Sequence, residues 1–235
     1  FMSLPKYNEK SKDSVLHLAE YLIGKRLEDI LASEQINEIN SLKGNKGGYG
    51  QIIEKYIFGK KPNSSPKPDF ECGVDCKVTP LYKKISDGNL APKERLVCNI
   101  INFLDIVNEE WETSSFLKKN SNNLIIRYID PRNSAINKSH YQIVDAMIFD
   151  LKESIYYEQF KNDWVNIVNK IKSGEAHEIS ESDTKWLGAC TKGANKDSLR
   201  NQPNSTIDAM QRAFSFKQQF MKQLLSDYPI SKDLY

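Results

Sequence analysis

One short segment constrains the fold more than any other, because it predicts a β-strand with charge on one face. In VDCKVT, residues 74–79, polar and apolar side chains alternate with a period of two, which places both valines and the cysteine on one face. Asp75 and Lys77 then lie side by side on the opposite face. Asp69 precedes this strand, and Pro68 restricts the backbone and so fixes its approach. The segment therefore predicts two carboxylates and an ammonium group close together at one strand of a sheet.

Charged groups in this arrangement suit phosphodiester chemistry. Two converging carboxylates repel each other, and a divalent cation commonly relieves that repulsion. Mg2+ takes oxygen ligands, keeps several waters and accepts substrate phosphate, so Asp69, Asp75 and the main-chain carbonyl of Cys76 are the expected ligands, with Mn2+ as an alternative metal. Lys77 is placed to orient or deprotonate an attacking water and to stabilise charge that develops on the phosphate. This is the chemistry of metal-assisted phosphodiester hydrolysis.

The motif alone has a simpler interpretation, which is a solvated strand face with a cross-strand ion pair. Its context favours a nuclease site. The P-D-x5-D-x-K form lies on a predicted strand, and an amphipathic helix over residues 49–59, YGQIIEKYIFG, precedes it. Glu54 lies at the margin of the apolar stripe of that helix, where its carboxylate could reach inward to a neighbouring site.

Periodic patterns elsewhere in the chain indicate an α/β fold in which helices flank a mixed sheet. Helices are expected over residues 14–24, 27–31, 49–59, 160–171 and 217–228, and strands over 74–79, 96–103 and 123–129. Residues 187–205 are rich in Gly, Asn and Ser, and are expected to form a loop.

Composition excludes several other classes of protein. The four cysteines and three histidines lack the spacing of a zinc site, and free thiols in a reducing compartment are the simpler interpretation. No apolar run approaches the roughly 20 residues of a membrane span, and no signal peptide opens the chain. We therefore expect a cytoplasmic protein with no membrane partner. A glycoside hydrolase would use paired carboxylates, but it needs neither the lysine nor basic segments.

The net charge of only +2 conceals a segregation of charge along the chain. Residues 43–67 contain six lysines and one acid, and residues 192–222 contain six basic residues and two acids. Between residues 145 and 183, nine acids face four lysines. Such segregation can form a basic cleft for nucleic acid, although a solvated charged surface would give the same pattern.

Larger blocks of the sequence resemble the MutH/Sau-type GATC endonucleases, a family of PD-(D/E)xK nucleases. The blocks follow in the family's order from about Lys46 to Leu225: KGGYGQIIEKYIFG, PDFECGVDCKVTP, KERLVCNIINF, WETSSFLKK and CTKGANKDSLRNQP. The resemblance is closer to the restriction branch, and within it to the catalytic N-terminal half of Sau-type enzymes. It implies one domain over residues 1–235 with a restriction-endonuclease-like mixed sheet. It also implies two lobes that form a DNA-binding cleft, about 1–110 with most of the active site and 111–235 with the DNA-reading loops. A fragment of a longer chain is one interpretation of this resemblance.

The resemblance also implies catalytic roles for single residues. The helix glutamate of the family falls on Glu54, the first metal-binding aspartate on Asp69 and the catalytic lysine on Lys77. The second acid is usually glutamate in an E-L-K triplet, whereas this chain has Asp75 in D-C-K, one methylene shorter. That departure bears on metal geometry, activity and metal preference. The family's lysine near the scissile phosphate falls on Lys119.

Contacts to DNA are implied for a larger set of residues. They are Lys46, Arg95, Lys118, Lys192, Asn195, Arg200, Ser215 and Lys217. By donor and acceptor matching, Lys192 and Arg200 suit guanine or phosphate, and Asn195 suits adenine. MutH has a tyrosine where Ser215 stands and an arginine where Cys190 stands. Both departures favour a restriction enzyme over MutH-like sensing of adenine methylation.

The leading hypothesis is therefore a magnesium-dependent type II restriction endonuclease that cuts double-stranded DNA at GATC. Two alternatives remain open, which are a MutH-like nicking endonuclease of mismatch repair and a non-catalytic GATC-binding or allosteric domain. Because GATC is a palindrome cut on both strands, dimerisation on DNA or two sequential nicks is expected.

Overall fold

The computed structural model describes residues 3–41, 48–61, 65–193 and 195–235. The chain divides into two compact units, and each draws on separate stretches of sequence. The first unit comprises Phe1–Glu94, Asn122–Phe149 and Leu225–Tyr235, and the second comprises Arg95–Ser121 and Asp150–Leu224. This division differs from the single boundary expected near residue 110, because the chain passes between the units more than once. A sequence pattern read in linear order gives no signal of such returns.

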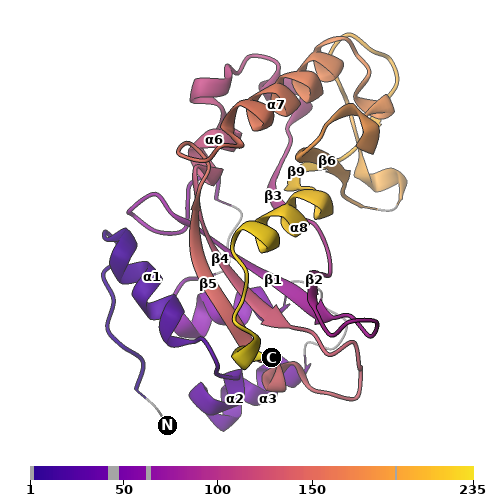
Figure 1. Ribbon diagram of the computed structural model, residues 1–235. Helices are drawn as coiled ribbons and strands as arrows, with labels where there is room; N and C mark the ends of the chain where they lie inside the picture. The colour runs from indigo at the N-terminus through magenta and orange to yellow at the C-terminus, as the bar shows by residue number, and fades with distance from the viewer. Residues whose placement is uncertain (1–2, 42–47, 62–64, 194) are drawn as a thin grey trace. The chain divides into compact units, whose positions relative to one another are not determined.

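A four-stranded mixed sheet forms the centre of the first unit, in the order β2-β1-β4-β5 (Figure 1). The strands are β1 Asp75–Lys83, β2 Leu90–Pro92, β4 Asn122–Ile129 and β5 Ile143–Asp150. β1 pairs antiparallel with β2 and parallel with β4, and the parallel register aligns Asp75 with Asn123 and Lys77 with Ile125. The mixed sheet that the sequence predicted is thus confirmed, and the segment VDCKVT opens its β1 strand.

The helices of the first unit pack on one face of this sheet. They are α1 Lys12–Tyr21, α2 Leu27–Ile30, α3 Ser33–Ser41, α4 Gly48–Ile52 and the π-helix η1 Ile53–Ile57. The side chain of Ser11 caps α1 by accepting a hydrogen bond from the backbone N of Ser14. Val74 and Cys76 of the β1 segment lie in the same hydrophobic core as the buried faces of these helices, so the facing predicted from the alternation is confirmed. A smaller cluster around Leu81 involves residues of the C-terminal segment.

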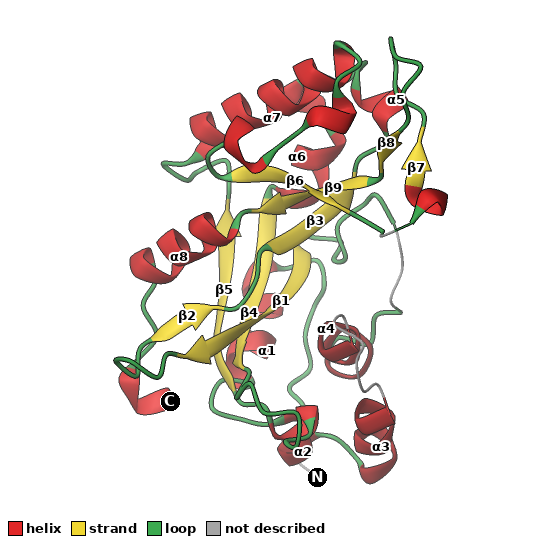
Figure 2. Ribbon diagram, turned by 90° about the vertical axis from the view of Figure 1, so that its right-hand side faces the viewer, coloured by secondary structure: helices red, strands yellow, loops and turns green. Residues whose placement is uncertain are grey.

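A three-stranded antiparallel sheet, in the order β3-β9-β6, forms the centre of the second unit (Figure 2). Its strands are β3 Leu96–Ile100, β6 Leu187–Thr191 and β9 Arg212–Phe216, and a short ribbon pairs β7 Leu199–Arg200 with β8 Ala209–Met210. The α-helices here are α5 Phe103–Ile106, α6 Ser115–Asn120, α7 Tyr157–Lys172 and α8 Gln218–Asp227, whose end enters the first unit. The 3-10 helices of the chain are η2 Trp111–Thr113, η3 Lys138–His140, η4 Ala176–Glu178, η5 Glu181–Asp183, η6 Lys196–Ser198 and η7 Lys232–Leu234.

Alternate residues of β9 face opposite sides of its sheet. Phe214 and Phe216 contact Phe116 of α6 and Phe160 of α7, each at a ring-centroid distance of 5.1 Å. The intervening Ser215 is buried on the other side, where polar residues gather. The second unit therefore has an aromatic core under α6 and α7, and a polar face on its other side.

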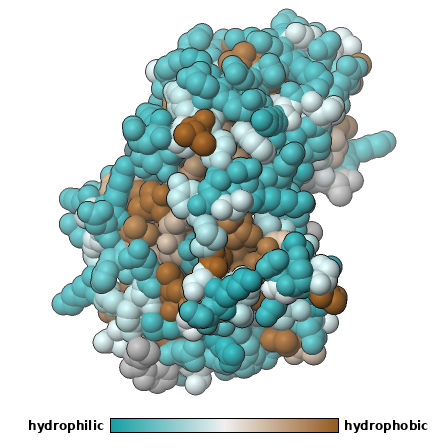
Figure 3. Space-filling model, in the orientation of Figure 1, coloured by the Kyte–Doolittle hydropathy of each residue, from teal (hydrophilic) through white to brown (hydrophobic). Residues whose placement is uncertain are grey.

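Most expected elements are present with ends shifted by a few residues, but two predictions were wrong or incomplete. The expected loop over 187–205 contains β6, η6 and β7, because Leu187–Thr191 is mostly small residues that give no strand alternation. The strands β2, β5, β8 and β9 were not predicted. Among the described residues no helix is long and apolar enough to cross a membrane, and hydrophilic side chains cover much of the face drawn in Figure 3.

Candidate active site

A tight turn before β1 fixes the position of the first candidate acid. The backbone N of Phe70 donates to the carbonyl of Val74 at 3.0 Å, and that of Gly73 donates to the carbonyl of Phe70 at 2.9 Å. Gly73 has a φ of +81°, in the left-handed region that glycine adopts without strain. Asp69 Oδ2 then accepts a hydrogen bond from the backbone N of Cys76 at 2.9 Å. The turn thus holds the carboxylate of Asp69 beside the start of β1.

Asp75 and Lys77 form an ion pair on one face of β1. The distance from Asp75 Oδ2 to Lys77 Nζ is 2.6 Å, and their side chains are only 1% and 12% exposed. Solvent screens a buried pair much less than a surface pair, so each charge acts strongly on its neighbour. The neighbouring position predicted from the strand period is confirmed, whereas the catalytic roles of both residues stay predictions.

Glu54 lies in the π-helical turn η1, and that turn packs on the segment that carries Asp69. Phe58, which follows η1, contacts Phe70 of the turn at a ring-centroid distance of 5.1 Å. The glycine at position 50 shows how near this helix is to the sheet, since a Cβ there would lie 3.6 Å from Val78 of β1. The helix therefore lies close against β1. Single π-helical turns within α-helices are frequent at functional sites, although no sequence pattern predicted this one.

The buried thiol of Cys76 reports how close the candidate groups are. Burial raises the pKa of Cys76 well above its ordinary value, and the charges of Glu54, Asp69 and Asp75 raise it further. The charge of Lys77 acts in the opposite direction. Together with the ion pair between Asp75 and Lys77 and the hydrogen bond from Cys76 to Asp69, these effects indicate that the four predicted residues lie in the neighbourhood of one residue of β1.

The carboxylates beside β1 form a donor set that suits a hard divalent cation. Among the described residues, no group of three or more His, Cys, Asp or Glu side chains is arranged to hold a metal. Mg2+ needs no such cage, because it is usually held by one or two carboxylates, waters and substrate phosphate. Asp69 and Asp75 offer the carboxylates. The raised pKa of Cys76 keeps its thiol protonated, so this residue could contribute only its carbonyl oxygen.

Lys119 belongs to the second unit, whereas the acids and Lys77 belong to the first. It lies in α6, which begins where Ser114 Oγ accepts a hydrogen bond from the backbone N of Leu117. The side chain of Lys119 is buried and that of Lys118 is exposed. A role for Lys119 beside the acids stays a prediction.

The predicted DNA-reading residues of the second unit lie mostly at the surface. Asn195 and Arg200 are exposed, and Lys192 is partly exposed. Arg200 Nη1 donates to the carbonyls of Asp197 and Leu199, both at 2.7 Å, so its guanidinium folds onto its own loop. Their contacts with DNA stay predictions, and Lys46 falls outside the described residues.

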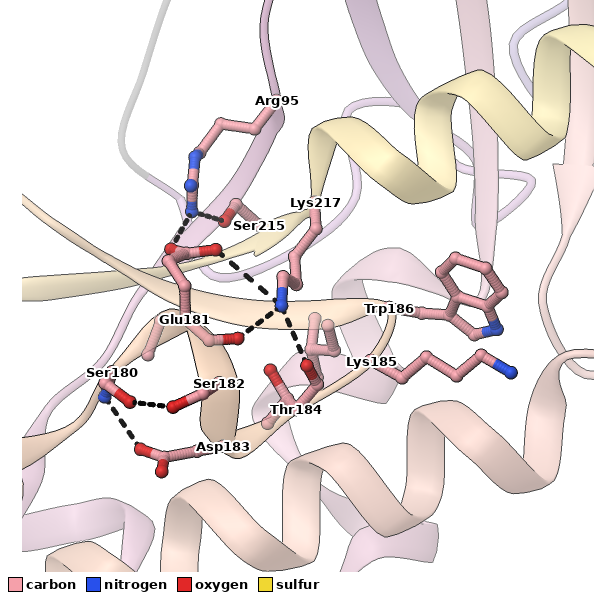
Figure 4. A network of polar contacts seen from close by, with 12 residues as sticks. Arg95, Ser180, Glu181, Ser182, Asp183, Thr184, Lys185, Trp186, Ser215 and Lys217 are labelled. Atoms are coloured by element: carbon pink, nitrogen blue, oxygen red, sulfur yellow. Dashed lines mark hydrogen bonds and ion pairs between the residues drawn. The ribbon is translucent and has the colours of Figure 1, made fainter.

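Three further predicted DNA-contacting residues meet in one polar network (Figure 4). Arg95 Nη1 donates to Ser215 Oγ at 3.3 Å, and Lys217 Nζ donates to the backbone carbonyl of Thr184 at 2.7 Å. Both cations also pair with Glu181, which the sequence did not single out. Burial opposes the ionisation of Glu181, but its hydrogen bond with Arg95 holds its pKa below the ordinary value. No local signal marks Glu181, because strands distant in the sequence assemble the network.

Comparison with known proteins relates this site to DNA-cleaving enzymes. Residues 58–163 match the family model described as DNA mismatch repair enzyme MutH. The type II restriction enzyme Sau3AI of Staphylococcus aureus is 40% identical over 225 residues, which are 95% of this chain and 44% of that protein. The mismatch repair protein MutH of Actinobacillus pleuropneumoniae is 26% identical over 222 residues, and that of Shewanella woodyi is 28% identical over 224 residues. The chain spans less than half of Sau3AI, but it covers 94% and 93% of these two MutH proteins.

Proposed function

We propose that this chain, which is similar to MutH proteins and to the restriction enzyme Sau3AI, belongs to the family of MutH and Sau-type endonucleases and hydrolyses double-stranded DNA as a type II restriction endonuclease. Enzymes of this kind generally use a divalent metal, which we assign as Mg2+, with Mn2+ as an alternative. The target is GATC, as the resemblance implies, and the compartment is the bacterial cytoplasm. One observation carries the proposal, namely the gathering of Glu54, Asp69, Asp75 and Lys77 around Cys76.

Residues of β1 and of the turn before it would have separate roles in the reaction. A bound Mg2+ would polarise the scissile phosphate and lower the pKa of a water. Asp69 and Asp75 would hold the metal, and the hydrogen bond from the backbone N of Cys76 keeps Asp69 oriented for it. Lys77 orients the attacking water and balances charge on the phosphate. The ion pair with Asp75 at 2.6 Å holds the amine of Lys77 in place for this role.

Residues outside β1 would support the metal site and bind the DNA. Glu54 would support the metal site from its helix, and Lys119 would contact the scissile phosphate. Base edges in the major groove suit the exposed Asn195 and Arg200 and the partly exposed Lys192, because their donors match guanine and adenine. The remaining predicted contacts, from Lys46, Arg95, Lys118, Ser215 and Lys217, would serve the sugar-phosphate backbone. On a palindromic site two chains would act together.

A cleavage assay with a matched control tests the proposal. The chain should cut a plasmid at GATC with Mg2+, and Lys77→Ala should lower the rate by about 100- to 10,000-fold while it still binds DNA. Lys84→Ala is the control, since it removes an equal charge from an exposed pair with Asp87 in the same unit. If the intact chain binds GATC duplexes with Mg2+ but never cuts them, the non-catalytic alternative is correct.

The second candidate function is a MutH-like nicking endonuclease. It is favoured by the extent of the match, since this chain covers 94% of the MutH protein of Actinobacillus pleuropneumoniae. A plasmid with a single hemimethylated GATC site separates the two functions when no partner protein is added. A restriction enzyme should cut without activation, whereas nicking that depends on added mismatch-repair proteins would support the alternative.

A further inference from the structure

Two cations of the second unit converge on one carboxylate above the polar face of its sheet (Figure 4). Arg95 Nη1 lies 2.8 Å from Glu181 Oε1, and Lys217 Nζ lies 3.8 Å from Glu181 Oε2. Arg95 directly precedes β3, Lys217 directly follows β9, and Glu181 opens η5. Residues from three separate parts of the unit thus form a single charged group with a net charge of about +1 at neutral pH.

The sheet beneath these cations is built from small residues. Gly188 of β6 pairs across the sheet with Ser215 of β9. A Cβ at Gly188 would lie 3.1 Å from Lys217 Cγ and 3.5 Å from Arg95 Nη1, so a larger residue would crowd both side chains. Ser215 adds a hydroxyl that accepts from Arg95. The strand pair therefore allows both cations to lie close to the sheet, next to each other.

The loop that carries Glu181 is held by contacts that do not involve its carboxylate. Lys217 Nζ donates to the backbone carbonyls of Glu181 and Thr184, at 2.5 and 2.7 Å. Farther along the loop, Asp163 accepts hydrogen bonds from the backbone N atoms of three consecutive residues, 185–187, at 2.6 to 2.9 Å. The fold of the loop therefore does not depend on the charge of Glu181.

The carboxylate is the most exposed part of the network. The side chain of Glu181 is 56% exposed, that of Arg95 30% and that of Lys217 11%. An ion pair whose carboxylate is exposed to solvent typically contributes little to stability, so another anion can replace Glu181 at little cost. A phosphate from solution would find two cations already oriented, with a hydroxyl beside them. Phosphate oxygens accept from arginine in the same paired geometry as a carboxylate does.

We propose that Glu181 is a built-in competitor for DNA phosphate, which occupies Arg95 and Lys217 in the free chain and is displaced by a backbone phosphate on binding. This inference rests on the proposed function, because it assumes a DNA ligand. Phosphate contacts carry no sequence information, so the competition weakens the hold on any duplex, whatever its sequence. Glu181 thus limits how long the chain stays on DNA that lacks the target.

Binding by Glu181→Gln to a short duplex without GATC tests the proposal, in a salt series without metal. Glutamine keeps the size of the side chain but removes its charge, so we expect about 3- to 10-fold tighter binding. The slope of log affinity against log salt should steepen by up to about 1, because an additional phosphate contact releases a counterion. Fluorescence anisotropy measures both quantities.

Glu112→Gln is the matched control for the loss of one negative charge. Glu112 lies in the same unit, its side chain is 62% exposed, and it pairs with Lys161 Nζ at 2.6 Å. This variant should bind within about 2-fold of the original chain, since no predicted DNA contact lies in its pair. The double variant Glu181→Gln, Arg95→Gln should lose the gain, which would trace the effect to Arg95.

Equal binding by Glu181→Gln and Glu112→Gln would overturn the inference, and so would a gain that persists without Arg95. Neither result would affect the proposed cleavage, which depends on the residues around Cys76. If instead the original chain binds no duplex at any salt concentration, the proposed function fails, and the competition fails with it. The two failures are therefore distinguishable in one set of titrations.

Discussion

Asp75→Glu tests the position at which this chain departs from the E-x-K form of the nucleases that it resembles. The change adds one methylene, which moves the carboxylate by about 1.5 Å along the side chain. The longer side chain cannot extend into solvent, because the side chain of Asp75 is buried and only 1% exposed. Its Oδ2 also lies 2.6 Å from Lys77 Nζ, so the longer side chain must shift the lysine or adopt a strained rotamer.

Two effects of this substitution can be estimated separately. An additional methylene in a closely packed site lowers the free energy of unfolding by about 1–3 kcal/mol. A displacement of about 1 Å in a catalytic group costs roughly 100-fold in rate, which corresponds to about 2.7 kcal/mol of transition-state stabilisation. We therefore expect Asp75→Glu to cut about 100-fold more slowly, with its affinity for GATC duplex nearly unchanged.

Single-turnover cleavage of a labelled GATC duplex with Mg2+, together with urea denaturation, measures both effects. Asp87→Glu is the control, since it makes the same chemical change in an exposed acid that pairs with Lys84. A cleavage rate for Asp75→Glu equal to or above that of the original chain would refute the reasoning. It would mean that the site does not depend on the shorter side chain.

Two further predictions concern buried residues that stabilise the two units. Asp163→Asn should lower the free energy of unfolding by about 3–5 kcal/mol. The reason is that a buried carboxylate, which accepts three backbone hydrogen bonds, becomes an amide with only one acceptor oxygen. A loss below about 1 kcal/mol in urea denaturation would contradict this. Burial, followed by the charge of Glu9, raises the pKa of Tyr7 to about 12. Its contribution to stability is therefore full below pH 10, the ordinary value, and is lost as the pH rises through about 12. Ultraviolet titration should show this phase, and Tyr7→Phe should remove it.

The first unit was more predictable from the sequence than the second, and the reason is physical. Alternation over six residues gave β1 and the pairing of Asp75 with Lys77, since strand geometry alone determines which side chains are neighbours. The apolar stripe around Glu54 likewise gave its helix. The π-helical turn was not predictable, because the apolar stripe does not distinguish it from an α-helical turn.

The strands of the second unit were harder to recognise. Side chains that pack against the sheet require small residues in β6, and small residues do not produce a polar and apolar alternation. β6 reads LGACT, and Gly188 is small because two cations lie against it. When side chains from neighbouring elements pack against a strand, the strand needs small residues such as glycine, and a run of small residues is typical of a loop. Glu181 was missed for a related reason, since nothing in its local sequence shows that Arg95 and Lys217 will meet it.

These differences separate two kinds of predicted site residue in the chain. Asp69, Asp75 and Lys77 lie within one turn and one strand, so local backbone geometry is sufficient to bring them together. Arg95 and Lys217 are brought together only after β3, β6 and β9 have paired, so their contacts depend on the folding of a whole unit. A substitution that disturbs the second sheet should therefore weaken DNA binding before it affects the geometry of the acids. Conversely, a substitution of Asp75 or Lys77 should slow cleavage and leave the contacts of Arg95 and Lys217 unchanged.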